Sequence, residues 1–399
     1  MPLHISDRRE RLIVATADQA LAALTKIARP FVRRRQLRAP KRVLVLRLER
    51  IGDLLMTLPA LADIRAFAPN AEIDLVVGSW NADLAHAIDP VNRVLCLDAS
   101  WLAREVEGQN ILSLIGAARR WRRVPYDLAI NFEPDIRGNL MLAASGAPWT
   151  AGYRSGGGGP LLDVALDFDS NAHTSDNARR LVAAIFEAPV PAEQPPTLVV
   201  PSQAQESASR LLAACGQPLI GVHASGGRAI KQWPIERFGE VARKLIEHTG
   251  ATIVLTGSAD DRAMVQTLKT ALPAEHVLDV AGQLDLLTLA GIVERMDLLV
   301  TGDTGPMHLA VAVGTPVVAV FGPSDPARYA PRGPLDCVVR VDLPCSPCNR
   351  IRLPPARCVG HTPDCLATIP IHDVFNAAVS VLERSARSGT MPVRLLRND

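Results

Sequence analysis

The 399-residue sequence lacks an apolar run long enough to span a bilayer, which takes about 18 residues. Its longest candidate, LAVAVGTPVVAVFG (309–322), is interrupted by Gly314, Pro316 and Gly322. The N-terminus also lacks the uninterrupted apolar core and the cleavage site of a signal peptide. We therefore expect no transmembrane segment and no secretion signal, and a cytoplasmic protein.

The sequence also lacks a strong net charge, because 43 Lys and Arg offset 41 Asp and Glu to +2. That balance gives no global reason to bind nucleic acid, and we expect no such partner. Seven cysteines, an odd count in a long chain, indicate a reducing compartment and not a disulfide framework. Hydrophobic residues make up 48% of the chain, as in globular proteins, and the length favours two domains.

Positive charge is nevertheless concentrated in residues 1–40, which hold nine Lys or Arg against three Asp or Glu, a net +6. Residues 8–38 read as a basic amphipathic helix, because apolar side chains recur every three or four residues along one face. These side chains are Ile13, Ala17, Ala20, Leu24, Ile27 and Phe31. Either this helix packs on the body or forms a loose tail, or it binds an anionic membrane surface.

From Lys41 onward, short apolar runs alternate with helical stretches, which is typical of a parallel sheet covered by helices on both faces. The predicted strands are residues 43–48, 73–78, 127–132, 219–224, 251–257, 297–303 and 315–322. We predict an α/β protein with two Rossmann-like domains facing across a cleft. Ligands of such sheets bind at the carboxyl ends of the strands.

A polar, Pro-rich stretch around residues 188–206 separates the two halves and reads as a linker. We therefore divide the chain into five predicted segments. They are a basic extension at 1–40, a first Rossmann-like domain at 41–190, a linker at 191–210, a second Rossmann-like domain at 211–385 and a tail at 386–399.

The most informative loop is TGDTGPMHL (301–309), which follows a predicted strand and opens a helix. The amides of Thr304 and Gly305 lie at the helix N-terminus, where anions bind, so we predict a diphosphate site. A carboxylate repels phosphate, so we expect Asp303 to orient or cap the turn, paired with a nearby cation. His308 in the first helical turn is either a structural residue or a contact to phosphate or ribose.

Two further loops follow strands of the second half. In GVHASGGRAIKQWPIERF, Lys231 supplies positive charge to a bound diphosphate, or is simply an exposed loop lysine. Ser225 in the same loop is placed to add a hydrogen bond. The third loop, TGSADD, offers Asp260 or Asp261 to the hydroxyl groups of a ribose.

In the first half, RLERIGD places Gly52 and Asp53 where a buried strand passes into a helix. On local evidence Asp53 caps that helix. At the mouth of a ligand site, the same carboxylate would instead accept a proton. The two roles compete, because a carboxylate that turns back onto its helix does not face a ligand. We expect Gly52 to permit a sharp turn that aims the carboxylate outward.

In order and spacing, these segments resemble glycosyltransferase family 9, the bacterial heptosyltransferases of lipopolysaccharide core assembly. The resemblance covers roughly residues 41–375 and includes VLVLRLERIGDLLMTLPAL, INFEPDIRGNL with AGYR, GVHASGGRAIKQWPIERF, and GDTGPMHLA followed by GTPVVAVFGP. It implies the GT-B architecture, with the acceptor on the first domain and the nucleotide sugar mainly on the second. It also implies an inverting reaction that needs no cofactor or divalent metal, with ADP-heptose as donor.

The resemblance also assigns roles to single residues. It places Asp53 at the position of the family's proposed general base. The implied donor site consists of Ser225, Lys231, Asp261, Asp303, Thr304, Gly305 and His308. The segment SGGRAI departs from the hydroxyl-rich loop of many members, which leaves Lys231 and Ser225 as its expected phosphate contacts. Nothing in the resemblance concerns residues 1–40.

Two arginines of the first domain are candidate contacts to the acceptor. Arg137 follows the predicted strand 127–132, and Arg154 lies in the glycine-rich stretch YRSGGGG. Both would bind acidic groups of a lipid-linked saccharide. The alternative is ordinary ion pairing at the surface. In the second domain, a Pro-rich loop holds Cys345, Cys348, Cys358 and Cys365. A structural zinc site and a packed loop of reduced cysteines are both consistent with that spacing, and we favour the second.

The leading hypothesis is an inverting, metal-independent transferase that moves heptose from ADP-heptose onto lipopolysaccharide core or a related lipid-linked acceptor. We expect it in the cytoplasm, peripherally bound to the inner face of the cytoplasmic membrane. One alternative is a family member that uses a different nucleotide sugar for another surface polysaccharide. The other is a nucleotide-sugar-binding scaffold without turnover.

Overall fold

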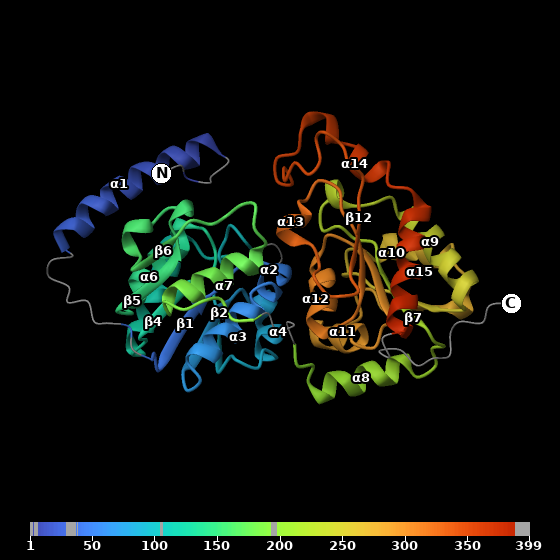
Figure 1. Ribbon diagram of the computed structural model, residues 1–399, viewed down its shortest axis with the longest axis horizontal. Helices are drawn as coiled ribbons and strands as arrows, with labels where there is room; N and C mark the ends of the chain where they lie inside the picture. The colour runs from blue at the N-terminus through green and yellow to red at the C-terminus, as the bar shows by residue number, and fades with distance from the viewer. Residues whose placement is uncertain are drawn as a thin grey trace. The chain divides into compact units, whose positions relative to one another are not determined.

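The computed structural model describes residues 3, 7–28, 37, 39–103, 107–192 and 198–387. The chain divides into two compact units, Met1–Gln194 and Pro195–Asp399. Each unit is built on a six-stranded parallel sheet with helices packed on it (Figure 1). The predicted α/β class with two parallel sheets is therefore confirmed.

The sheet of the first unit has the strand order β3-β2-β1-β4-β5-β6. Its strands are β1 (Arg42–Leu46), β2 (Glu72–Val77), β3 (Arg93–Cys96), β4 (Leu128–Asn131), β5 (Trp149–Tyr153) and β6 (Val164–Leu166). The order reverses between β1 and β4, and parallel sheets bind ligands at the carboxyl ends of strands at such a point. This reversal places the loops after β1 and β4 side by side.

The described residues of the first unit also contain seven α-helices. They are α1 (Arg8–Ala28), α2 (Ile51–Leu55), α3 (Leu58–Phe67), α4 (Ala82–His86), α5 (Ile111–Arg120), α6 (Ile136–Ser145) and α7 (Thr174–Ile185). Helices α5 and α6 pack on the face of the sheet that carries Leu44 and Leu46. Helix α7 packs on α3, and a buried ion pair joins them, with Arg179 Nε 2.8 Å from Asp63 Oδ2.

The sheet of the second unit has the order β12-β11-β10-β7-β8-β9, with its reversal between β7 and β10. Its strands are β7 (Leu219–His223), β8 (Thr252–Leu255), β9 (Val277–Asp279), β10 (Leu298–Gly302), β11 (Val317–Val320) and β12 (Cys337–Val339). The core strands β7, β8, β10 and β11 are fully buried. Continuous burial explains why the sequence shows them as unbroken apolar runs.

Helices cover both faces of this second sheet. They are α8 (Ser202–Leu212), α9 (Ile235–Thr249), α10 (Arg262–Thr270), α11 (Leu286–Val293), α12 (Gly305–Val313), α13 (Pro326–Tyr329), α14 (Asp364–Ala367) and α15 (Ile371–Arg387). Helices α9, α10 and α15 share one hydrophobic core with the sheet. Helices α8, α11 and α12 share the other. Both faces are therefore buried, as a parallel sheet requires.

The predicted linker at 191–210 overlaps α8, which begins at Ser202 and belongs to the second unit. Ala204, Ala208 and Leu212 recur every four residues and are buried, and α8 packs on α11. This spacing makes one face of α8 apolar, which the polar composition of the stretch obscured. The rest of the predicted linker includes residues 193–197, which lie outside the described residues.

Helix α1 occupies the first part of the helix predicted at 8–38; most of residues 29–38 lie outside the described part. It packs on the first unit, but not through the predicted apolar stripe. Val14 is buried, whereas Ile13 and Leu24 of the stripe are exposed. Among the described residues, no helix has the length and apolarity needed to cross a membrane.

Candidate functional site

The diphosphate turn predicted in the second unit lies at the reversal point of its sheet, directly after β10. Helix α12 begins at Gly305 with a proline in its first turn, as predicted. Thr304 precedes the helix in an extended conformation, and its Oγ1 lies 3.1 Å from Oγ1 of Thr301. The first amides of α12 therefore have no intrahelical acceptor and form a site suited to an anion.

Lys231, from the loop after β7, reaches the same turn. Its Nζ lies 2.7 Å from Oδ2 of Asp303, and the two side chains are only 19% and 11% exposed. The cation that the sequence required beside Asp303 is therefore Lys231. An ammonium group has three donors, so Lys231 can hold Asp303 and still donate to a phosphate oxygen. The adjacency of β7 and β10 in the sheet brings these residues together.

Ser225 and Asp261 meet beside this turn, at the ends of β7 and β8. The Asp261 carboxylate accepts hydrogen bonds from the backbone N–H and the hydroxyl of Ser258, at 2.8 and 2.7 Å, and another from Ser225. Burial by itself would raise the pKa of Asp261, but these hydrogen bonds and nearby His223 bring it below its ordinary value. Of the two aspartates in this loop, the structure favours Asp261 as an ionised carboxylate at the strand ends.

His308, the remaining predicted donor residue, lies in the first turns of α12 and is 8% exposed. The sequence did not single out His223, the last residue of β7. Burial lowers the pKa of His223 to about 4, and its Nδ1 lies 3.0 Å from Oγ1 of Thr256. His223 is therefore neutral near pH 7. In the sequence, the available signal for His223 was its position directly before a loop rich in predicted site residues.

The neutral state of His223 predicts an acid-labile fold. Between its ordinary pKa of 6.5 and about 4, the unfolded chain binds a proton that the folded chain does not. The free energy of unfolding should therefore fall through this window as the pH is lowered, by ~3 kcal/mol. In His223→Gln this contribution disappears, so urea titrations at a series of pH values should give a flatter profile. The control is His372→Gln, whose side chain is 73% exposed; equal slopes in wild type and H223Q would contradict the prediction.

In the first unit, Asp53 lies at the third position of α2, directly after β1. Its Oδ2 accepts a hydrogen bond from the Arg50 N–H at 3.3 Å, and its Oδ1 lies 3.7 Å from Nη2 of Arg47. The carboxylate thus turns back onto its own helix, as in the capping alternative, yet 28% of the side chain remains exposed. The sharp turn expected of Gly52 is absent, because Gly52 is a helical position of α2.

Arg47 was missed by the sequence analysis, although it lies within RLERIGD. It is 2% exposed at the end of β1, and its Nε donates to the Asp53 carbonyl at 3.0 Å. Its Nη1 donates to the Phe132 carbonyl at 2.9 Å and lies 2.5 Å from Oε2 of Glu49. One buried guanidinium therefore fixes the loops after β1 and β4. A charge directly after an apolar strand was the signal for it.

Glu133, after β4, is a second buried ionisable group at this edge. Burial, followed by the charges of Glu49 and Asp135, raises its pKa well above the ordinary value, against the opposing effect of Arg47 and Arg137. The carboxyl edge of the first sheet thus carries a partly exposed Asp53 and a buried Glu133. Such shifts gather at functional sites, although ion-pair networks also produce them.

The two predicted acceptor arginines are both ion-paired. Arg137 pairs with Asp135, and its guanidinium lies 4.2 Å from the ring centre of Trp101. Arg154 pairs with Asp167 through two contacts of 3.0 and 2.8 Å at the exposed surface. The surface-pairing alternative therefore describes the geometry of Arg154 well. Arg137 lies beside the loop after β4, so its acceptor role stays a prediction.

The cysteine loop of the second unit contains free thiols. Burial and the neighbouring thiols Cys348, Cys345 and Cys358 raise the pKa of buried Cys365 to about 11. In the described part of the chain, no three His, Cys, Asp or Glu side chains are arranged to hold a metal ion.

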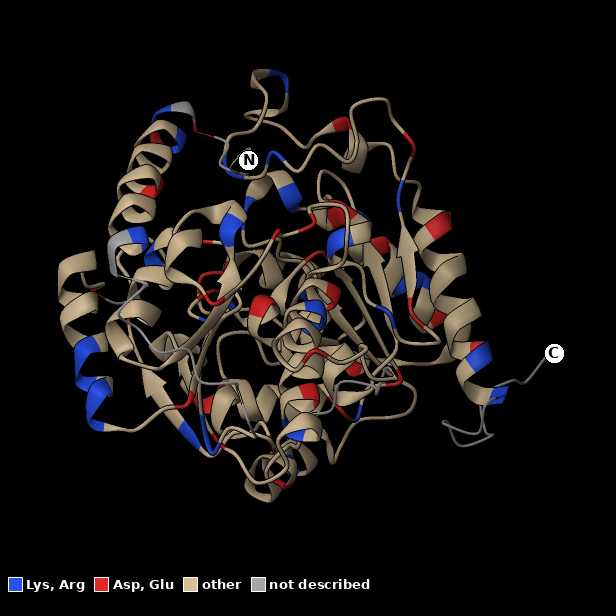
Figure 2. Cartoon of the chain, turned by 60° about the vertical axis from the view of Figure 1, so that its left-hand side comes forward, with Lys and Arg blue, Asp and Glu red and all other residues tan. Residues whose placement is uncertain are grey.

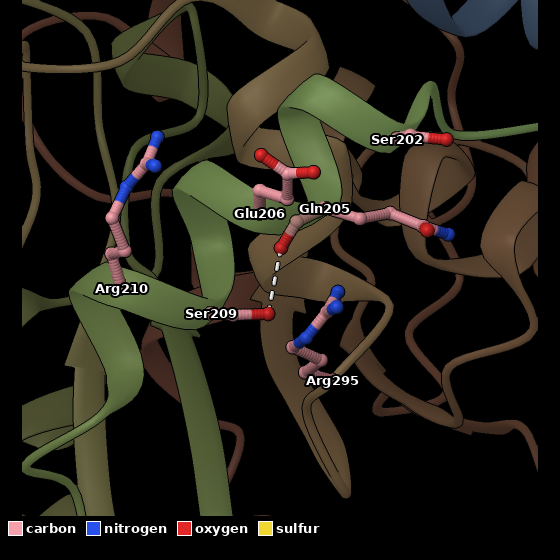
Figure 3. A pocket seen from close by; sticks show the side chains of 6 residues that line it. All are labelled: Ser202, Gln205, Glu206, Ser209, Arg210 and Arg295. Atoms are coloured by element: carbon pink, nitrogen blue, oxygen red, sulfur yellow. Dashed lines mark hydrogen bonds between the residues drawn. The ribbon is translucent and has the colours of Figure 1, made fainter.

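A surface hollow of about 470 Å³ lies along α8, away from the strand ends (Figure 3). Its lining residues are Ser202, Gln205, Glu206, Ser209, Arg210 and Arg295. Ser209 Oγ donates to the carbonyl of Gln205 at 2.8 Å, so this contact stays within the helix. The hollow contains none of the predicted site residues, and we assign no function to it.

Comparisons with known proteins identify similar proteins over most of the chain. The family model described as glycosyltransferase family 9 (heptosyltransferase) matches residues 115–355. The lipopolysaccharide core heptosyltransferase OpsX of Haemophilus influenzae is 24% identical over 310 residues, which cover 76% of this chain and 85% of that protein.

Two solved structures show the same fold. The E. coli ADP-heptose lipopolysaccharide heptosyltransferase II has a TM-score of 0.70 at 23% identity and covers 86% of this chain and 99% of its own. The E. coli heptosyltransferase WaaC with ADP-2-deoxy-2-fluoro heptose has a TM-score of 0.60 at 23% identity and covers 75% and 93%. Both support the GT-B architecture.

Proposed function

Because the chain belongs to glycosyltransferase family 9, we propose that it transfers heptose from ADP-heptose to a lipid-linked acceptor of the lipopolysaccharide-core type. The transfer inverts the anomeric centre and needs no catalytic metal. ADP-heptose as donor is supported by a similar structure that holds a fluorinated analogue of it. The lipopolysaccharide acceptor is supported by the names of similar proteins.

The observation that carries the proposal is the Lys231–Asp303 pair at the N-terminus of α12. When the glycosidic bond of the donor breaks, negative charge accumulates on the leaving diphosphate. Lys231 and the N-terminus of α12 stabilise that charge, which supplies the electrostatic role of a divalent cation. Asp303 fixes the ammonium position and does not contact the phosphate. Asp261 and Ser225, beside this turn, are assigned to the ribose side of the donor.

In this mechanism the acceptor hydroxyl attacks the anomeric carbon while the bond to the diphosphate breaks, and Asp53 receives the hydroxyl proton. A weak base suffices, because the hydroxyl becomes acidic only as its oxygen bonds to the oxocarbenium-like carbon. A single displacement inverts the configuration. Arg47 orients Asp53 through its carbonyl and its carboxylate. Arg137, held by Asp135 and Trp101, is assigned to acidic groups of the acceptor.

A donor panel tests this function. We expect ADP-heptose to bind more tightly than GDP-, UDP- and dTDP-sugars and to be the donor that is slowly hydrolysed without acceptor. Binding is read by calorimetry and hydrolysis by release of the nucleoside diphosphate. A preference for a UDP-sugar would overturn the heptose donor and leave the second candidate function, transfer of another sugar to a different surface polysaccharide.

We also propose that the enzyme works at the cytoplasmic face of the membrane, where a lipid-linked acceptor is anchored. The basic segment at 8–38 suggested such a contact, and its described part is α1. The packing of α1 on the first unit determines which face of the helix is available to contact lipid.

A further inference from the structure

Helix α1 is seated on the first unit through one defined face. The Asp18 carboxylate accepts a hydrogen bond of 2.5 Å from the backbone N–H of Gly158, and Val14 is 6% exposed. Gly157 and Gly158 both adopt left-handed backbone conformations, with φ of 93° and 76°. A Cβ added to Gly157 would lie 2.3 Å from Cγ1 of Val14, so the glycine loop admits the helix only because it lacks side chains.

The opposite face of α1 is apolar and uncovered. Leu12, Ile13 and Leu24 are 70%, 69% and 64% exposed, although α1 spans only 21 residues. At 3.6 residues per turn they share a face with Ala20 and Ala23, turned away from Val14 and Asp18. Single exposed apolar residues are ordinary, but three on one helical face are not.

Basic side chains flank this apolar face. Arg9, in the first turn of α1, lies within the arc of this face, and Lys26, in the last turn, lies at its edge. Figure 2 shows the middle of α1 mostly tan between its charged ends. Apolar side chains between cationic ends match a bilayer interface, where acyl chains lie beneath anionic phosphates.

We propose that the face of α1 formed by Leu12, Ile13 and Leu24, hereafter the outer face, inserts into the interfacial layer of an anionic membrane. Arg9 and Lys26 then contact the lipid phosphates. The inference rests on the proposed function in one respect, because the lipid-linked acceptor supplies the membrane. A second copy of the chain fits less well, because antiparallel pairing of two outer faces would set Arg9 against Lys26 of the other copy.

The position of α1 on the first unit links the membrane contact to the transfer reaction. The glycine loop follows β5 at the carboxyl edge of the sheet, the same edge that carries Asp53 and Glu133. The carboxylate of Glu10 in α1 lies close enough to Arg137 to help raise the pKa of its guanidinium. A membrane-bound α1 therefore holds the acceptor-side loops next to the lipid surface, where a lipid-linked saccharide emerges.

Vesicle sedimentation of the full chain tests the inference. Wild type should bind vesicles that mix phosphatidylglycerol with phosphatidylcholine and should bind pure phosphatidylcholine at least ~10-fold less, with binding weakened by salt. Leu12→Gln, Ile13→Gln and Leu24→Gln together should reduce binding at least ~10-fold. The matched control is Leu112→Gln, a leucine of α5 in the same unit that is 78% exposed, which should bind as wild type does.

The charge arm replaces Arg9 and Lys26 by Gln and should weaken the preference for anionic vesicles. Equal binding of the apolar triple variant and wild type would overturn the inference, as would equal binding to both vesicle types. Sedimentation equilibrium tests whether a second copy of the chain covers the outer face instead. If wild type is a dimer, and the triple variant is a monomer that binds vesicles as wild type does, the outer face is a dimer interface.

Failure of this inference is separable from failure of the proposed function. Vesicle binding is measured without donor or acceptor, and transfer is measured with a delipidated, soluble acceptor. The triple variant should transfer heptose to that acceptor at the wild-type rate. If wild type binds vesicles but does not use ADP-heptose, the proposed function alone is wrong. If wild type transfers heptose but does not bind vesicles, the membrane contact of the outer face alone is wrong.

Discussion

Replacing Asp53 by asparagine is expected to lower kcat for sugar transfer by roughly 10²–10⁴-fold. The amide matches the carboxylate in shape and still accepts the hydrogen bond from the Arg50 N–H. It no longer accepts a proton from the attacking hydroxyl. Donor affinity should stay unchanged, because the proposed donor residues all belong to the second unit. Transfer assays and donor titration together give the required separation of rate from binding.

The control for this variant is Asp83→Asn, which also lies in the first turn of a short helix of the first unit and is exposed. It should leave transfer at the wild-type rate. The Asp53 test must separate a catalytic role from a structural one, because the carboxylate also caps α2. If Asp53→Asn transfers sugar normally while Asp53→Ala only lowers the melting temperature, Asp53 is a helix cap and another group is the base.

Replacing Lys231 by alanine is expected to lower kcat by about 10²–10³-fold, the usual cost of removing one group that stabilises developing charge. Its removal also leaves Asp303 unpaired beside the diphosphate, and we therefore expect weaker donor binding as well. The double variant Lys231→Ala with Asp303→Asn should recover part of the donor affinity, because the repulsive carboxylate is gone. It should not recover the rate. Calorimetry with ADP and single-turnover transfer assays measure the two effects.

Lys269→Ala is the matched control, because Lys269 also pairs with an aspartate, Asp279, at 3.5 Å in the same unit. It lies in the last turn of α10, at the far end of that helix from Asp261. This variant should bind and turn over donor as wild type does. Wild-type donor affinity in Lys231→Ala would contradict the assignment of Lys231 to the diphosphate and leave it a structural ion-pair partner of Asp303.

Much of the fold is predictable from the sequence because its central strands are buried on both faces. Such strands need unbroken apolar runs, and β1, β2, β4, β7, β8, β10 and β11 all fall on the predicted ones. The strands β3, β5, β6, β9 and β12 escaped prediction. Most residues of β3, β6, β9 and β12 are partly buried or exposed. Partial burial tolerates polar side chains, which removes the apolar signal. Strand β5 is buried at four of its five residues but reads WTAGY, which is not an unbroken run of strongly apolar side chains.

The candidate site is predictable in part for a related reason. In a parallel sheet every strand ends at the same edge, so polar residues directly after strands are candidates wherever they lie in the chain. This rule found Asp53, Lys231 and Asp303. It did not find Arg47 or His223, because a single charged or imidazole side chain at the end of an apolar run does not reveal what it contacts.

The sequence by itself determined the fold class, the family and the positions of the candidate site residues, because apolar runs, glycine loops and helix starts are local features of the chain. Only the tertiary structure decided which of them meet. The pairing of β7 with β10 sets Lys231 against Asp303, and buried Arg47 holds Asp53 on its own helix. Likewise α1 turns its apolar face outward because Val14 and Asp18 fit the glycine loop. These outcomes depend on contacts between distant segments, which local patterns do not encode.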